Sequence, residues 1–152
     1  MINMSHQEKN ILASLTSSIV TFSVYALITS NLYQDGRFAL ADGNSFLGKA
    51  ILLLILGGVI SNIVITILFN IIFAVVQNEP KPSFVVDERD DVIELKGKRF
   101  AINIIGIGMI IAMIALARDG SIFLVFNLLI AAFALSDISG NIFMFVLHRK
   151  GL

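Results

Sequence analysis

The sequence predicts an all-α integral membrane protein, a four-helix bundle whose transmembrane helices form two antiparallel hairpins. Hydrophobic residues make up 57% of the 152 residues and charged residues only 14%, against about 25% charged in soluble proteins. Residues 50–76 contain no charge, and a helix needs about 20 mostly apolar residues to cross a bilayer. Three further segments approach that length without period-2 alternation, which excludes a transmembrane barrel.

Each apolar segment must be a helix, because backbone groups in lipid can satisfy their hydrogen bonds only internally. Asp-Gly pairs follow the first segment, both prolines follow the second, and Arg118-Asp119-Gly120 separates the third from the fourth. Acidic residues open the third helix, where the helix dipole favours them. The chain is therefore one membrane domain with a link at 78–99 and helices at about 11–30, 46–77, 87–117 and 121–148.

The distribution of Lys and Arg predicts the orientation of these helices. Lys9, five residues of the link 78–99, Arg149 and Lys150 lie on one side, and Arg37, Lys49 and Arg118 lie on the other. Cytoplasmic loops carry the excess of Lys and Arg. We therefore expect both termini and the link in the cytoplasm, with the helices in a bacterial inner membrane.

A short similarity between the two halves raises the alternative of a parallel internal repeat. Ser61-Asn62-Ile63 in the second helix recurs as Ser136-Asp137-Ile138 in the fourth. Two hairpins of the same orientation would form such a repeat. Apolar sequence of low complexity also produces such matches by chance, so both interpretations stay open.

Asp137 is the one acid inside an apolar segment, and an ionisable residue there is a functional candidate. The tight turn at Asp119 places Asp137 level with Ala101, which predicts an ion pair with Lys98 or Arg99. Counting back from Arg149 instead places Asp137 about 18 Å inside, at 1.5 Å per residue. The first count predicts a structural ion pair, and the second allows a proton-carrying role.

The same register continues toward the cytoplasm. It places Asn141 level with Gly97, Phe145 with Ile93 and His148 with Asp90, so the basic C-terminal end would face the acids at the start of the third helix. The candidate residues are accordingly the charged and polar groups of this end and of the apolar helices: Asp87, Glu88, Asp90, Asp91, Glu94, Lys98, Arg99, Asn62, Asp137, Asn141, His148 and Arg149.

Polar residues also recur at helical spacing along single faces. The predicted stripes are Ser14, Ser18, Thr21 and Tyr25 on the first helix; Asn62, Thr66 and Asn70 on the second; Asn103, Gly106 and Met113 on the third; and Asn127, Ala134, Asp137, Asn141 and His148 on the fourth. Interhelical hydrogen bonding beside small residues is one explanation. A polar path for an ion or small solute is the other.

The chain lacks the usual signs of catalysis. It has no cysteine and only two histidines, His6 and His148, at opposite ends. We find no nucleophile–base pair, metal-ligand spacing or phosphate-binding loop. We therefore expect no enzyme activity, no cofactor or metal and no direct binding of nucleic acid.

Residues 87–99, DERDDVIELKGKR, resemble the DERD…IELK…R signature of small four-helix bacterial membrane proteins of uncharacterised function. In that family the signature precedes the third transmembrane helix, and the chain ends in a short basic motif with Gly, similar to residues 148–151. His148 departs from the aromatic residue expected there. The resemblance covers the second half of the chain, implies a helix-turn-helix regulator as a partner by association only, and supplies no catalytic residues.

These observations predict a non-enzymatic membrane protein that docks or regulates a cytoplasmic partner through the link 78–99. The alternative is a small proton- or ion-coupled transporter or channel that uses the polar stripes and Asp137. A third interpretation is an accessory subunit of a membrane complex. Self-association into a homo-oligomer is compatible with each of them.

Overall fold

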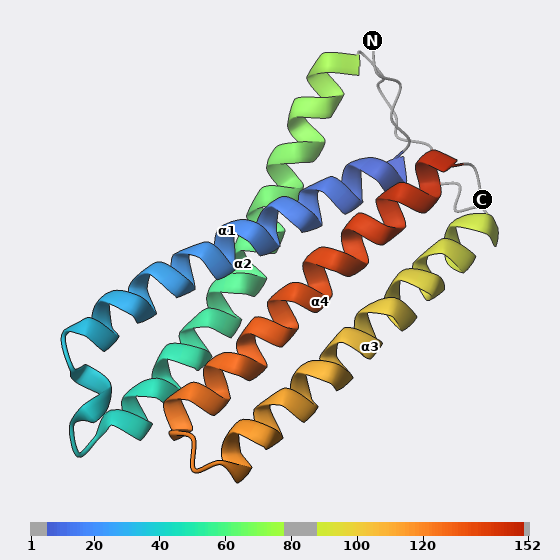
Figure 1. Ribbon diagram of the computed structural model, residues 1–152. Coiled ribbons are helices and arrows are strands. Elements are labelled where there is room, and N and C mark those ends of the chain that lie inside the picture. Colours follow the sequence, from blue (N-terminus) through green and yellow to red (C-terminus); the bar gives the residue numbers. More distant parts are fainter. Residues whose placement is uncertain (1–5, 78–87, 151–152) are drawn as a thin grey trace.

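The computed structural model describes residues 6–77 and 88–150, and this part of the chain is all-helical (Figure 1). Its four long helices are α1 (His6–Gln34), α2 (Gly43–Gln77), α3 (Glu88–Ala117) and α4 (Ile122–Lys150), with a short 3₁₀ helix, η1 (Arg37–Ala39), between α1 and α2. All four contain a window long and apolar enough to cross a membrane. The all-α class with four helices that could each span a membrane is therefore confirmed, and α1 begins at His6, earlier than the expected residue 11.

The helix ends follow local chemistry. After α1, Gly36 adopts a left-handed conformation with φ 70°, which glycine accepts without a Cβ penalty. Asp119 takes the same region at φ 58°, and the N–H of Gly120 donates to the Ala115 carbonyl at 2.9 Å, closing the end of α3. The Ser121 hydroxyl accepts a hydrogen bond from the Leu124 N–H at 3.2 Å and caps α4.

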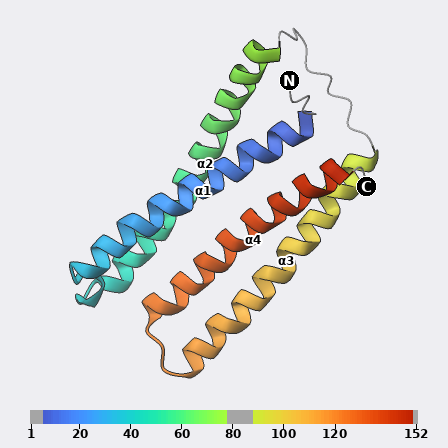
Figure 2. The ribbon, with the colours of Figure 1, turned by 45° about the horizontal axis from the view of Figure 1, so that its top comes forward.

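The helices form an open bundle rather than a closed one. The most extensive contact joins α3 to α4, α1 packs on both α2 and α4, and α2 touches α4 only slightly. Figure 2 shows α3 and α4 side by side, with the C-terminal half of α2 apart from α4 in both views. The spatial order is therefore α2, α1, α4, α3. In the described residues α1 packs on α4, but α2 and α3 do not pack on each other to a similar extent.

Small residues set the close approach of α3 and α4. A Cβ on Gly108 would lie 2.1 Å from the Cβ of Ala132, and a Cβ on Gly140 would lie 3.1 Å from that of Ala101. Lipid tails are as apolar as leucine, so such contacts between small residues, and not exclusion of water, favour helix association in a bilayer. The same contacts leave few large side chains enclosed; Ile93 is the largest that is fully buried.

The predicted polar stripe on α3 does not face the other helices. Asn103 and Met113 are exposed, and a Cβ on Gly106 would meet no atom within 4 Å. The residues of α3 that face α4 are instead Gly97 and Gly108. The prediction for this stripe was wrong because helical spacing shows which residues share a face without showing what that face meets.

Candidate functional site

Asp137 joins α4 to α1 in the middle of the bundle. The Ser18 hydroxyl on α1 donates a hydrogen bond to one carboxylate oxygen of Asp137. On α4 itself, the Asn141 amide donates to the other carboxylate oxygen at 3.2 Å and to the Asp137 carbonyl at 2.8 Å. Ser18 and Asn141 are buried, so two fixed donors hold the carboxylate from both sides.

The packing of α4 on α3 explains why Asp137 points toward α1. Ser136 donates a hydrogen bond to the Ala101 carbonyl at 2.8 Å and is itself buried against α3. Successive residues of an α-helix are rotated by about 100°. With Ser136 directed at α3, Asp137 turns away from α3 and toward the side of the bundle formed by α1 and α2.

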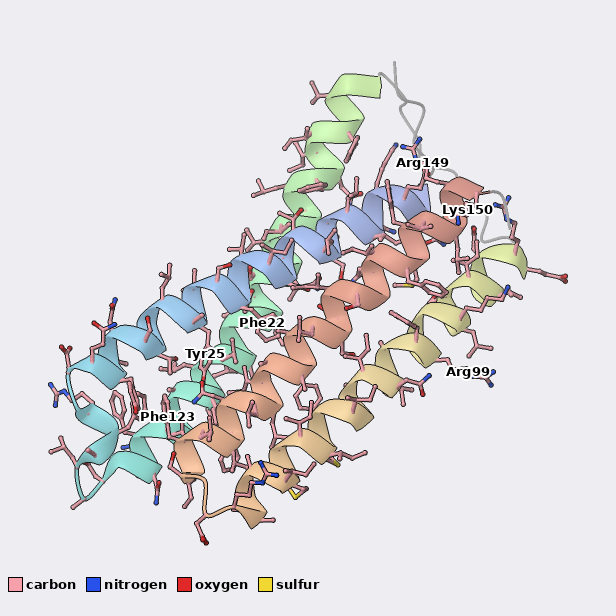
Figure 3. All side chains as sticks on the ribbon, in the orientation of Figure 1. Phe22, Tyr25, Arg99, Phe123, Arg149 and Lys150 are labelled. Atoms are coloured by element: carbon pink, nitrogen blue, oxygen red, sulfur yellow. The ribbon has the colours of Figure 1, made fainter. Side chains whose placement is uncertain are left out.

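The expected ion pair between Asp137 and Lys98 or Arg99 is therefore absent from the described residues. Lys98 pairs with Glu94 one turn earlier on α3, and both side chains are more than half exposed. Arg99 lies two residues before Ala101, so it occupies the opposite side of α3 and points away from α4 (Figure 3). The predicted level was right, but the level of a residue does not determine its direction.

Asp137 opens into a cavity of about 690 Å³ between α1, α2 and α4. Apolar side chains form most of its wall, and its polar groups lie on one stretch of α1, at Asn62 of α2 and at Asp137 of α4. The lining residues are Ser17, Ser18, Thr21, Phe22, Ile51, Leu54, Ile55, Gly58, Val59, Asn62, Ile63, Leu129, Ile130, Phe133 and Asp137. Among these residues Asp137 is the one ionisable side chain.

Two further polar groups of the cavity have unused hydrogen-bonding capacity. Thr21 Oγ1 is fully buried and has no hydrogen-bond partner within the described part of the chain. The Asn62 carbonyl oxygen accepts from the Thr66 hydroxyl at 3.3 Å, which leaves its amide nitrogen without a described partner. A buried polar group without a partner costs about 1–3 kcal/mol, so the Thr21 hydroxyl favours an occupant that can bond to it.

The distance from Asp137 to the nearest charged residues differs between the helices. Arg149 lies 12 residues beyond it on α4, which is about 18 Å along the helix, whereas Arg99 on α3 is only about 3 Å beyond the level of Ala101. On the α2 side, exposed apolar residues continue to Val75, and Lys9 of α1 lies over the Phe73 ring at 5.2 Å. Asp137 is therefore close to charged residues along α3 and far from them along α4, and its depth in a membrane stays a prediction.

A second polar link lies nearer the other end of α1 and α4. The Tyr25 hydroxyl donates to the Asn127 side-chain carbonyl at 3.2 Å, and the Asn127 amide donates to the Phe123 carbonyl at 2.8 Å. Tyr33 stacks on Phe123 with centroids 4.8 Å apart, and Figure 3 shows Tyr25 and Phe123 where α1 meets α4. The stripe predicted on α1 therefore contacts α4 at two levels.

The charged end of the bundle differs in part from expectation. The expected proximity of His148 and Asp90 is present, with 3.6 Å between Nδ1 and Oδ1. Arg149 does not join the acids of α3. It pairs with Glu8 of α1 at 3.0 Å and lies over the Phe145 ring at 5.4 Å.

Sequence reasoning missed Glu8 because the first helix was expected to begin after it. A helix extended back past Lys9 would have included Glu8 and so made it a candidate partner for the basic C-terminal end. Glu8 is buried, while Glu88 and Asp91 are exposed on α3. Asp87 lies outside the described residues.

The described residues contain no group of three or more His, Cys, Asp or Glu side chains placed to hold a metal ion. Comparisons of the chain with family models, curated proteins and solved structures found no match. The geometry of the chain's own residues therefore carries the functional assignment.

Proposed function

We propose that this chain is a bacterial inner-membrane protein that binds a small positively charged solute at Asp137 and couples its binding to a proton, as a small transporter does. One observation carries this proposal: a carboxylate held by two donors opens into a large cavity between membrane-spanning helices. Ionisable residues within membrane-spanning segments are costly and mark ion and substrate pathways.

The surroundings of Asp137 suit a group that exchanges a proton for another cation. Ser18 and Asn141 donate hydrogen bonds to the carboxylate, and the cavity walls around it are mostly apolar. A bound cation stabilises the carboxylate, and a proton neutralises it when the cation leaves.

The proposal includes a membrane topology of two antiparallel hairpins with both chain ends cytoplasmic. The excess of Lys and Arg at the ends and in the link 78–99 supports this orientation. The pairing of α1 with α2 and of α3 with α4 is compatible with it. In this orientation the polar surface nearest Asp137 is the cytoplasmic end of α3.

Reaction with a lipid-soluble carbodiimide tests the proposed function. Dicyclohexylcarbodiimide is the electrophile that protonated carboxyl groups add to where it reaches them from the apolar phase. We expect it to modify Asp137 in membranes, with less modification as the pH rises, and mass spectrometry of the digested protein locates the adduct. The Asp137→Asn variant should lose this adduct.

A water-soluble carbodiimide is the matched reagent, and the exposed carboxylates Glu88 and Asp91 are the internal control because they should react with it in opened membranes. If Asp137 stays unmodified by the lipid-soluble reagent at every pH while the protein remains folded, the carboxyl is not accessible from the apolar phase. The proposed proton-coupled role would then be abandoned.

Docking of a cytoplasmic protein is a second candidate, because α3 has an uncovered face before its apolar segment. Val92 and Leu95 are at least half exposed there, beside Glu88 and Asp91. A helix-turn-helix regulator is the partner that the signature implies. Co-purification of such a regulator with the chain, lost in a Val92→Asp, Leu95→Asp variant, would support docking; retention in that variant would exclude this face.

A further inference from the structure

We propose that the solute bound at Asp137 is a lipophilic monovalent organic cation that enters the cavity from the bilayer. This inference rests on the proposed function and names the chemical class of its ligand. The charge, wall chemistry, size and open side of the cavity each support it.

The charge of the cavity selects a cation of single charge. Asp137 supplies one negative charge, and no Lys, Arg or His is among the described lining residues. An anion would meet an uncompensated carboxylate. A hard divalent ion needs about six oxygen ligands, whereas this cavity offers one carboxylate and a few hydroxyl and amide oxygens on three different helices.

The walls select an organic body rather than a hydrated ion. Phe22 of α1 and Phe133 of α4 line the cavity together with aliphatic residues of α2 and α4. Aromatic faces attract cations, and apolar walls gain free energy by covering an apolar ligand. The volume of about 690 Å³ lies within the range of about 300–1,000 Å³ typical of small-molecule sites.

The open side of the cavity faces the apolar phase. Ile55, Val59, Ile63 and Phe133 line it and are each more than half exposed. These residues lie on α2 and α4, which contact each other only slightly. A ligand dissolved in the bilayer can therefore pass between α2 and α4 and reach Asp137 without crossing a polar barrier.

Binding of such a cation is an exchange that conserves charge. The protonated Asp137 releases its proton to water as the cation enters, and the carboxylate is left opposite the bound charge. No covalent bond to carbon forms or breaks. The Thr21 hydroxyl and the Asn62 amide are the remaining polar groups available to a substituent on the ligand.

Tetraphenylphosphonium binding to the purified full chain in lipid nanodiscs tests the ligand class. We expect saturable binding that is at least tenfold weaker in Asp137→Asn, that is retained in Asp137→Glu and that weakens as the pH falls. A neutral analogue, triphenylphosphine oxide, should not compete. Tetraphenylphosphonium should also protect Asp137 from the lipid-soluble carbodiimide.

A pair of glycine variants tests the cavity without altering the charge. Gly58 lines this cavity and Gly57 does not, and a Cβ on Gly57 would meet no atom within 4 Å. Gly58→Leu should weaken tetraphenylphosphonium binding at least tenfold, because the added side chain occupies part of the cavity. Gly57→Leu should bind as the natural chain does.

The outcomes separate the two proposals. If carbodiimide modifies Asp137 but tetraphenylphosphonium neither binds saturably nor protects it, the ligand class is wrong and the proposed function stands. If tetraphenylphosphonium binds equally well to the natural chain, Asp137→Asn and Gly58→Leu, the binding occurs elsewhere and the inference is overturned. Absence of any carbodiimide adduct would remove the proposed function itself.

Discussion

The Ser18 hydroxyl on α1 donates a hydrogen bond to the carboxylate of Asp137 on α4, across 119 positions of sequence. This contact joins the first hairpin to the second. It also holds the acid at the mouth of the cavity that α2 completes. The same bond therefore helps to hold α1 against α4 and fixes the position of the one carboxyl group among the residues that line the cavity.

Replacing Ser18 should lower the stability of the bundle and remove a hydrogen-bond donor from Asp137. We expect Ser18→Ala to lower the free energy of unfolding by about 0.5–1.5 kcal/mol, because interhelical hydrogen bonds in membranes contribute about that much. Ser30 is exposed, and its hydroxyl bonds to the Leu27 carbonyl of its own helix rather than to another helix of the described chain, so Ser30→Ala is the control. Unfolding in mixed micelles measures both variants, and additive effects of Ser18→Ala and Asp137→Asn would contradict a direct bond.

The glycines of α3 should differ sharply in their tolerance of alanine. A Cβ on Gly108 would lie 2.1 Å from that of Ala132, so Gly108→Ala should force α3 from α4 and cost about 1–3 kcal/mol. Gly106 lies on the same helix with open space around it, so Gly106→Ala should be neutral or stabilising by up to about 1 kcal/mol. Thermal unfolding of the two variants measures the difference. Equal losses of stability would show that the contact of Gly108 with Ala132 does not set the separation of α3 and α4.

The stabilisation from the ion pair of Arg149 and Glu8 should depend on both charges. Glu8 is buried, so Arg149→Gln should destabilise the chain by about 1–3 kcal/mol by removing a partner of a buried charge. Lys150→Gln, at the neighbouring exposed position, is the control and should change stability by less than about 0.5 kcal/mol. Exchange of the charges in a Glu8→Arg, Arg149→Glu variant should restore part of the loss, and failure of any rescue would argue against a specific pair.

Labelling of single cysteines tests the proposed topology, since the natural chain has no cysteine. Asp42→Cys, in the connection between α1 and α2, should react with an impermeant maleimide in whole cells. Asp91→Cys, on the first turn of α3, should react only after the membrane is opened. The reverse pattern would overturn the orientation inferred from Lys and Arg.

A disulfide crosslink tests the extension of α3 and α4 toward the cytoplasm. Ile93 is buried with 1% exposure, and the contacts of Ser136 with Ala101 and of His148 with Asp90 place Phe145 at its level. Phe145, nine residues after Ser136, lies on the opposite side of α4 from α3, so the expected proximity of the Ile93 and Phe145 side chains was wrong. Leu147 is buried and lies on the Ser136 side of α4. Cysteines at Ile93 and Leu147 should therefore crosslink under mild oxidation. A pair at Ile93 and Gly36 lies at opposite ends of different hairpins and should not. If the first variant folds but does not crosslink, α3 and α4 must pack in a different register.

Hydropathy was sufficient to predict the four helices, because a backbone in lipid has one local solution for its hydrogen bonds. The turn at Asp119 was likewise sufficient to predict which residues of α3 and α4 lie level, since a short connection between long helices leaves little freedom. His148 and Asp90, predicted at the same level, lie 3.6 Å apart. These features depend on composition and spacing within one or two adjacent segments.

The directions of side chains around each helix depended on the tertiary structure. Asp137 was expected to meet Lys98 or Arg99, yet the bond from Ser136 to Ala101 turns Asp137 toward Ser18. A lipid-facing surface can be as apolar as a helix-facing one, so hydropathy gives little indication of which face meets a neighbour. The cavity and the pairing of Arg149 with Glu8 join segments far apart in sequence, and only the packing of α1 against α4 brings these residues together.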